Sequence, residues 1–197
     1  MRSPQIPELI VYTGSMWSGK SRALIGQLEL GRIAHIQVLL VRPTKDTRKV
    51  RSGSEFTGDT IFISGASAIF DHVLDAYEWI GFDEAQFFEE DLIDVIKQLL
   101  RMEKRVLVAG LDLDFREEPF VVVAKMMSLA NDVHKLKAVC AQCRSLEGTR
   151  SQRLTDNQTV EEVGGEDKYE PRCFRCFVPP NGVVHSSDSM RIDPLSS

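Results

Sequence analysis

Eight consecutive residues near the N-terminus, Gly14 to Ser21, follow the pattern G-x-x-x-x-G-K-[ST]. A loop of this kind holds nucleotide phosphates, because its glycines let successive backbone N–H groups point at phosphate oxygens. Lys20 can reach the β- and γ-phosphates, and Ser21 can bind Mg²⁺. A glycine-rich turn with a solvated lysine is the alternative, but a buried strand before the loop and a helix after it favour triphosphate binding. The predicted ATP-binding residues are Gly14, Ser15, Met16, Trp17, Ser18, Gly19, Lys20 and Ser21.

Two adjacent carboxylates, Asp83 and Glu84, follow the apolar residues 80–82. A phosphate loop needs an acidic partner at the end of another strand, and Asp83 has the position expected for a contact with Mg²⁺. Glu84 can accept a proton from an attacking hydroxyl group. An acidic pair that merely faces solvent is the alternative. The phosphate loop elsewhere in the chain favours a catalytic role for both residues.

The four cysteines form two Cys-x-x-Cys pairs, Cys140 with Cys143 and Cys173 with Cys176. Four thiolates can complete a tetrahedral Zn²⁺ site that has no open position, which makes such a site structural. The segment between the pairs would then be a loop tied at its base, although it has little core of its own. A redox pair or buried free cysteines are the alternatives. The four histidines show no ligand spacing.

Apolar periodicity predicts an alternation of strands and helices, and therefore an α/β fold with a mostly parallel sheet and helices on its faces. Pro43 is expected to stop the second strand, and Pro119 to lie near the first turn of the last helix. The character of the chain changes at 133–139. Strands are predicted at 9–13, 37–41, 60–64, 78–83 and 105–110, and helices at 20–34, 66–77, 90–102 and 119–129.

Composition restricts the class of protein. The chain has 197 residues, of which 43% are hydrophobic and 27% charged, so it can bury a core and is not disordered as a whole. No apolar run is long enough for a membrane span, and the N-terminus is a poor secretory signal, so we expect a cytoplasmic protein without membrane contact. The formal net charge of −5 argues against a nucleic-acid partner.

Several motifs occur together in the order found in one family. They are Asp46-Thr-Arg48, Asp83-Glu-Ala-Gln-Phe-Phe88, Leu111-Asp112 through Phe115, Pro119-Phe120, the cysteine pairs and Gly164-Gly-Glu-Asp-Lys-Tyr169. Between residues 9 and 176 the chain resembles the type II thymidine kinases. The resemblance implies a P-loop NTPase-type core and a small zinc-ribbon lid domain. It also implies transfer of the ATP γ-phosphate to the 5′-hydroxyl of thymidine, and of deoxyuridine, in a homotetramer.

The same resemblance implies roles for individual residues. Glu84 becomes the general base, Lys20 and Arg48 supply positive charge, and Asp46 and Gln86 join the ATP and Mg²⁺ site. A surface arginine in a charged loop is the alternative for Arg48. The implied nucleoside site consists of Met16, Phe87, Leu111, Phe115 and Phe120 on the core, and Ser151, Val160, Glu162, Gly164 and Tyr169 on the lid.

Three features depart from the family pattern, one of them the segment from Thr57 to Ser67. Glu162 stands where an apolar residue is common, and Trp17 replaces a phenylalanine or tyrosine in the phosphate loop. Without the resemblance, the phenylalanines would be interpreted as ordinary core residues. The domain organisation expected is a tail at 1–8, the kinase core at 9–139, the zinc-binding lid at 140–178 and a disordered tail at 179–197.

Two other classes of protein are alternatives to a nucleoside kinase. An ATP-driven protein whose zinc ribbon grips DNA is compatible with the phosphate loop and the cysteines, but residues 140–176 carry no basic stripe. A non-catalytic zinc-ribbon module leaves the phosphate loop unexplained. The sequence therefore favours a nucleoside kinase.

Overall fold

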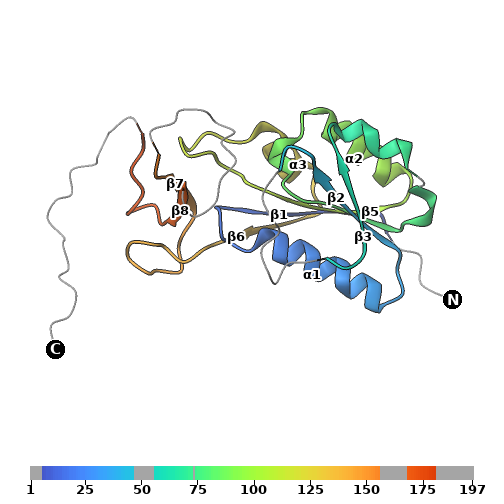
Figure 1. Cartoon of the computed structure of the whole chain (residues 1–197), viewed down its shortest axis with the longest axis horizontal. Helices are drawn as coiled ribbons and strands as arrows, with labels where there is room; N and C mark the ends of the chain where they lie inside the picture. The colour runs from blue at the N-terminus through green and yellow to red at the C-terminus, as the bar shows by residue number, and fades with distance from the viewer. Residues whose placement is uncertain (1–5, 47–55, 73, 156–167, 181–197) are drawn as a thin grey trace, which may run out of the picture.

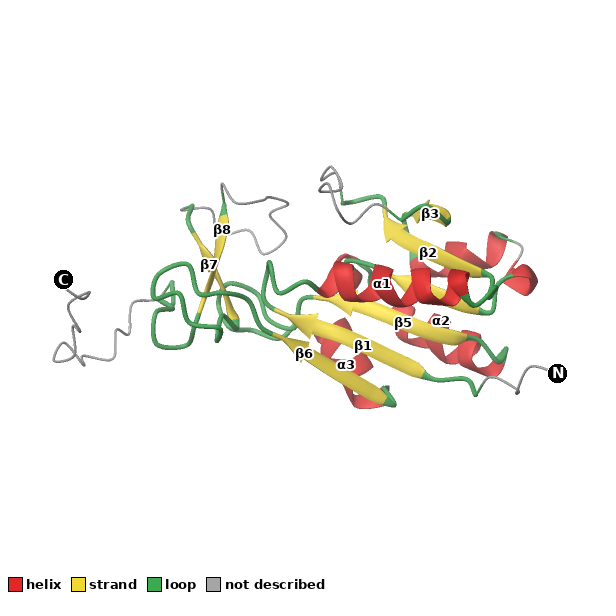
Figure 2. Ribbon diagram, turned by 90° about the horizontal axis from the view of Figure 1, so that it is seen from below, coloured by secondary structure: helices red, strands yellow, loops and turns green. Residues whose placement is uncertain are grey.

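The computed structural model describes residues 6–46, 56–72, 74–155 and 168–180. Six strands form one sheet in the order β3-β2-β4-β5-β1-β6, and every pairing between neighbours is parallel. Helices α1, α2 and α3 lie against the sheet (Figures 1 and 2). The strands are β1 (Leu9–Gly14), β2 (Val38–Pro43), β3 (Asp59–Ile63), β4 (Trp79–Phe82), β5 (Arg105–Gly110) and β6 (Asp132–Leu136).

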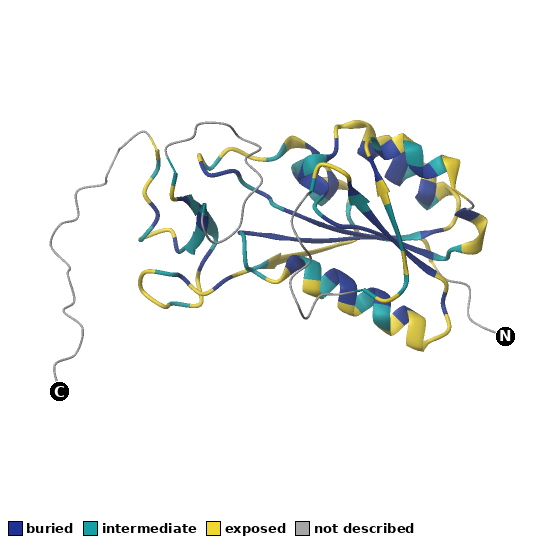
Figure 3. Ribbon diagram, viewed as in Figure 1, coloured by how far each residue is buried: buried dark blue, intermediate teal, exposed yellow. Residues whose placement is uncertain are grey.

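The two faces of the sheet bury alternate strand residues, as period-two side-chain geometry requires. On one face Leu24, Ile25 and Leu28 of α1 (Lys20–Ile33) pack against Leu40 and Leu107. A Cβ at Gly81 would lie 2.8 Å from Leu28 Cδ1, so the absence of a side chain there lets α1 approach β4 closely. The central strands are accordingly buried on both faces, as Figure 3 shows.

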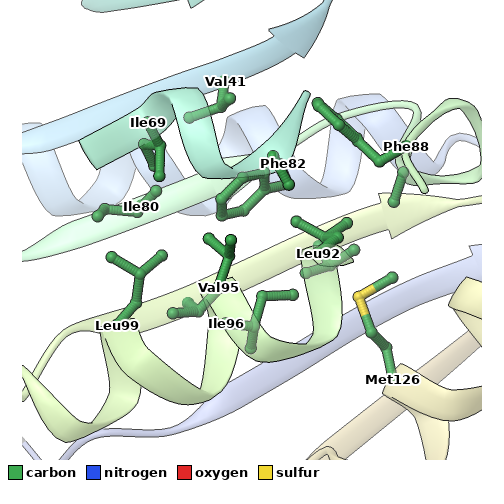
Figure 4. Close-up of a cluster of buried hydrophobic side chains, with 14 of the residues drawn as sticks. Val41, Ile69, Ile80, Phe82, Phe88, Leu92, Val95, Ile96, Leu99 and Met126 are labelled. Atoms are coloured by element: carbon green, nitrogen blue, oxygen red, sulfur yellow. The ribbon is translucent and has the colours of Figure 1, made fainter. Parts of the chain in front are cut away.

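The opposite face carries α2 (Asp91–Arg101) and α3 (Val121–Leu129). Leu92, Val95, Ile96 and Leu99 of α2 pack with Phe82 in a buried cluster that Met126 of α3 also joins (Figure 4). Helices thus cover both faces, and the predicted fold class is confirmed. None of the helices in the described part of the chain combines the length and the hydropathy that a membrane span requires.

Two local predictions were wrong, and one strand was not predicted. Residues 66–77 do not form one helix but two 3-10 helices, η1 (Ala66–Asp71) and η2 (Leu74–Ala76), separated by His72 in an extended conformation. Strand β6 was not predicted, because its residues lie at the sheet edge, are mostly exposed and show no apolar alternation. Pro43 ends β2, as expected, whereas α3 begins at Val121, two residues after the predicted start at Pro119.

A second, small unit follows β6 in the chain and lies beyond the ends of β1 and β6 (Figure 2). It contains the antiparallel pair β7 (Arg150–Arg153) and β8 (Tyr169–Arg172), and a bridge joins Ala138 to Gly148. This region corresponds to the predicted lid, whose boundary at residue 140 stays a prediction. Residues 1–5 and 181–197, which make up most of the two predicted tails, lie outside the described residues.

Candidate active site

The phosphate loop connects the end of β1 to the start of α1. Gly14 has a φ of +132°, and a Cβ there would lie 2.1 Å from the Leu136 carbonyl oxygen, so only glycine fits beside β6. Gly19 also has a positive φ, of +88°. The Lys20 ammonium is buried and donates to the Ser15 carbonyl at 2.7 Å. The predicted ATP-binding residues 14–21 therefore run from the last residue of β1 through the loop into the first turn of α1.

Asp83 is brought to this loop although 62 residues separate it from Ser21. Its Oδ1 accepts a hydrogen bond from Ser21 Oγ at 2.8 Å, and its Oδ2 accepts one from Arg42 Nη2 at 3.1 Å. Burial raises the pKa of Asp83 to about 6, the neighbouring Glu84 carboxylate adds to the rise, and the Arg42 guanidinium opposes it. The pair of Ser21 and Asp83 is a set of hard oxygen donors of the kind that Mg²⁺ prefers.

Glu84 follows Asp83 in a left-handed backbone conformation, with φ 53° and ψ 45°. This conformation is costly for a residue other than glycine and is concentrated at functional sites. Glu84 Oε2 accepts a hydrogen bond from Gln86 Nε2 at 2.6 Å, and Gln86 Oε1 accepts one from the Leu111 backbone N–H at 3.0 Å. The structure therefore places Glu84 at the end of β4, beside the acidic partner of the phosphate loop.

The small unit contacts the phosphate loop directly. Ser15 Oγ donates to the Gly148 carbonyl at 2.8 Å, and the Met16 backbone N–H donates to Ser151 Oγ at 3.0 Å. Strand β7 buries alternate residues, so Arg153 lies on the same side as Ser151. The structure thus joins Met16 and Ser151, two of the residues predicted for the nucleoside site.

Arg153 links two further predicted residues. Its guanidinium carbon lies 3.7 Å from the centroid of the buried Phe115 ring and 5.0 Å from that of Tyr169, and its Nη2 donates to the Tyr169 hydroxyl. Stacking of a guanidinium on aromatic rings is favourable, particularly away from water. Phe115 of the β5–α3 loop and Tyr169 of β8 are therefore held together by one buried cation.

The remaining predicted residues are less closely connected. Phe87 is half-buried in η3 (Ala85–Phe87). Phe120 packs against the buried cluster between the sheet and helices α2 and α3, which is consistent with the interpretation of Phe120 as a core residue. Asp46 lies in the turn after β2, where its N–H donates to the Pro43 carbonyl. Four residues predicted for the site lie outside the described residues: Arg48, Val160, Glu162 and Gly164.

The four cysteine sulfurs lie within 4.8 Å of one another, and Cys143 Sγ is 3.7 Å from Cys173 Sγ. Four sulfurs bound to one Zn²⁺ at ~2.3 Å in a tetrahedron would be about 3.8 Å apart, so the cluster fits this ion. Hydrogen bonds from Ser145 lower the pKa of Cys143 to about 6, whereas burial and the other thiols raise that of Cys176 to about 12. A dication would offset the repulsion that keeps four thiolates from forming together.

Comparison with known proteins identifies the family. Residues 7–177 match the family model described as thymidine kinase. The thymidine kinase of Coprothermobacter proteolyticus is 41% identical over 175 residues, which cover 84% of this chain and 87% of that protein. The thymidine kinase of a Rhodothermus species is 40% identical over 181 residues, covering 90% and 84%. The chain belongs to the thymidine kinase family.

Two solved structures resemble this thymidine kinase family member more distantly. The flagellar accessory protein FlaH of Methanocaldococcus jannaschii has a TM-score of 0.41 at 14% identity, covering 85% of this chain and 88% of that one. Domain III of the replication initiation protein DnaA of Thermotoga maritima has a TM-score of 0.40 at 10% identity, covering 68% and 57%. At these scores neither protein bears on the function of the chain.

Sequence reasoning missed three groups of this kinase site. Arg42 could have been found, because it lies at the carboxyl end of β2, which pairs with the strand that leads to Asp83. Arg153 lies two residues after Ser151 and therefore shares its face of β7. The Gly148 carbonyl is a backbone group, and no sequence signal indicates that it accepts from Ser15.

Proposed function

We propose that the chain transfers the γ-phosphate of ATP to the 5′-hydroxyl of thymidine, giving thymidine monophosphate, with Glu84 as the general base. The observation that carries the proposal is the set of contacts of Glu84. Its backbone N–H donates to Asp83 Oδ1, which also accepts from Ser21 Oγ, and its carboxylate accepts from Gln86, whose Oε1 accepts from the Leu111 N–H. A base at this point can remove the proton of a hydroxyl group that attacks a phosphate held by the loop.

The phosphate loop supplies alignment and positive charge. Lys20 would exchange the Ser15 carbonyl for phosphate oxygens, which are stronger acceptors because they are charged. Ser18 Oγ is buried and has no hydrogen-bond partner among the described residues, so it is available to a phosphate oxygen. Ser21 and Asp83 would hold Mg²⁺, which neutralises the charge that develops on the phosphates. Arg48, which lies outside the described residues, would supply further positive charge.

The lid orients the nucleoside. Leu111 and Phe115 would supply apolar groups from the core. Ser151 of β7 accepts from the Met16 N–H, and Tyr169 of β8 is joined to Phe115 through Arg153. The four-cysteine cluster, with Zn²⁺ bound, would fix the base of the lid, since the small unit has little apolar core of its own. A rigid lid keeps the acceptor hydroxyl in line with the transferring phosphate and excludes water.

Further properties follow from the family relationship. We propose that deoxyuridine is a second substrate, because it differs from thymidine by one methyl group, which contributes only a modest discrimination. A homotetramer and a cytoplasmic location belong to the same proposal. Size measurement in solution, with and without ATP, tests the assembly.

The experiment that tests the function is the release of ADP from ATP and Mg²⁺ in the presence of thymidine, with the product identified by mass. We expect ADP only with the nucleoside, and none with free thymine, which lacks the acceptor hydroxyl. Single-stranded DNA is included as the competing activator. ADP release that responds to single-stranded DNA and not to thymidine would overturn the proposal.

A further inference from the structure

Both ends of the Gln86 side-chain amide are engaged. The residue is 4% exposed in the short helix η3, directly after Glu84 and Ala85. Its Nε2 donates to Glu84 Oε2 at 2.6 Å, and its Oε1 accepts from the Leu111 N–H at 3.0 Å. Because one end must donate and the other must accept, only an amide in this orientation satisfies both partners.

The packing around Gln86 is close. A Cβ at Gly110 would lie 3.3 Å from Gln86 Oε1 and 3.2 Å from Ala85 Cβ, so the glycine at the end of β5 leaves the space that the amide fills. Strands β4 and β5 are neighbours in the sheet. The amide therefore forms a buried bridge from the end of β4, where Glu84 stands, to the first residue after β5.

Gln86 has no hydrogen bond to the phosphate loop among the described residues, since its two bonds go to Glu84 and Leu111. The contact of Gln86 with ATP that the family resemblance implied stays a prediction. Glu84 is only partly buried and lies in a left-handed turn. A buried neutral donor such as Gln86 Nε2 can hold this carboxylate in one orientation.

We infer that Gln86 is a positioning residue, which holds the Glu84 carboxylate toward the acceptor hydroxyl and ties its orientation to Leu111 at the nucleoside site. The inference rests on the proposed function, in which Glu84 is the base. It assigns to Gln86 an effect on turnover instead of an effect on ATP binding. Partners of this kind, one contact removed from the reacting group, typically change activity by ~10–100-fold in metal sites.

The first test compares Gln86→Glu with Gln98→Glu. Gln86→Glu keeps the size and the acceptor for Leu111, but it replaces the donor to Glu84 with a second carboxylate. We expect kcat to fall by about 10–100-fold while the KM for ATP stays within about twofold. Gln98 is exposed on α2, so Gln98→Glu makes the same charge change away from the site and should leave kcat unaltered.

A double-mutant cycle decides whether Gln86 acts through Glu84. Gln86→Met removes the amide at similar volume, and we expect it to lower kcat by a similar factor in the wild-type chain. In the Glu84→Gln background it should cost less than about threefold, because the group that it positions is already lost. Circular dichroism and the melting temperature verify folding. If Gln86→Glu does not fold, the Gln86→Met cycle gives the result alone.

Three outcomes would overturn the inference. They are a wild-type kcat in both Gln86 variants, a rise in the KM for ATP without loss of kcat, or a Gln86→Met effect on kcat that is as large in the Glu84→Gln background as in the wild-type chain. None of these affects the proposed phosphoryl transfer, which fails if the wild-type enzyme shows no thymidine-dependent ADP release, while the role of Glu84 as base is tested by the Glu84→Gln single variant. The two failures are therefore distinguishable.

Discussion

Arg42 Nη2 lies 3.1 Å from Asp83 Oδ2, and the two side chains are 12% and 3% exposed. The residues belong to the ends of β2 and β4, which are adjacent and parallel. This ion pair is therefore nearly removed from water, and it supports the carboxylate that also accepts from Ser21. Removal of one partner would leave the other charge buried without compensation.

Arg42→Met should consequently destabilise the protein by up to about 3–5 kcal/mol, measured as a fall in the melting temperature. Arg42→Met combined with Asp83→Asn should be more stable than Arg42→Met alone, because the uncompensated charge is gone. Lys97→Met is the control, since the exposed pair of Lys97 and Asp94 should contribute less than ~0.5 kcal/mol. Equal melting temperatures for Arg42→Met and the wild type would contradict this account.

Glu84→Gln should lower kcat by about 10²–10⁴-fold, because the amide cannot accept the proton of the attacking hydroxyl. The KM for ATP should change little, since Lys20 and the loop backbone are intact. Glu103→Gln is a matched control: Glu103 is exposed and has the same left-handed backbone, with φ 59°. Steady-state assays in which ATP and thymidine are varied in turn measure kcat and the KM for each substrate separately. Wild-type turnover in Glu84→Gln would remove it from the role of base.

Ser151→Ala should weaken the connection between the lid and the phosphate loop, because Met16 N–H loses its acceptor. A net loss of ~0.5–1.5 kcal/mol corresponds to a rise of roughly 2–10-fold in the KM for thymidine. Ser128→Ala, which changes an exposed hydroxyl on α3, should leave this KM unaltered. The prediction fails if both variants behave alike.

Metal analysis should find about one Zn²⁺ per chain, and Cys173→Ser should lose most of it, because Cys173 is one of four clustered thiols. Chelation should make the segment around β7 and β8 sensitive to limited proteolysis before the core is cut. The sheet core has its own apolar clusters and should resist. A metal-free preparation with full activity and an intact lid would contradict the structural role.

Gly14→Ala and Gly26→Ala should change stability in opposite directions. A Cβ at Gly14 overlaps the Leu136 carbonyl, and the backbone there has a positive φ, so we expect a loss of several kcal/mol and of ATP binding. Gly26 is exposed inside α1 and a Cβ there meets nothing within 4 Å, so alanine should stabilise by about 0.5–1 kcal/mol. Thermal unfolding of both variants tests the prediction.

The sequence alone determined those parts of the site in which a short run of residues carries its own chemistry. The phosphate loop, the adjacent pair of Asp83 and Glu84, and the two Cys-x-x-Cys pairs are of this kind. The buried strands were also predictable, because strands covered on both faces must be continuously apolar. Residue types and short spacings suffice where the chemical groups are neighbours along the chain.

Only the tertiary structure decided which distant groups meet. The order β2-β4-β5-β1 places the carboxyl ends of strands that are not consecutive in the chain next to one another. It therefore joins Arg42 to Asp83 and Asp83 to Ser21. Strand β6 has exposed residues on both faces, so its position beside β1 depends on backbone pairing that leaves no apolar pattern. The Gly148 carbonyl and the stacking of Arg153 on Phe115 likewise depend on how the small unit packs against the loop, which local sequence does not encode.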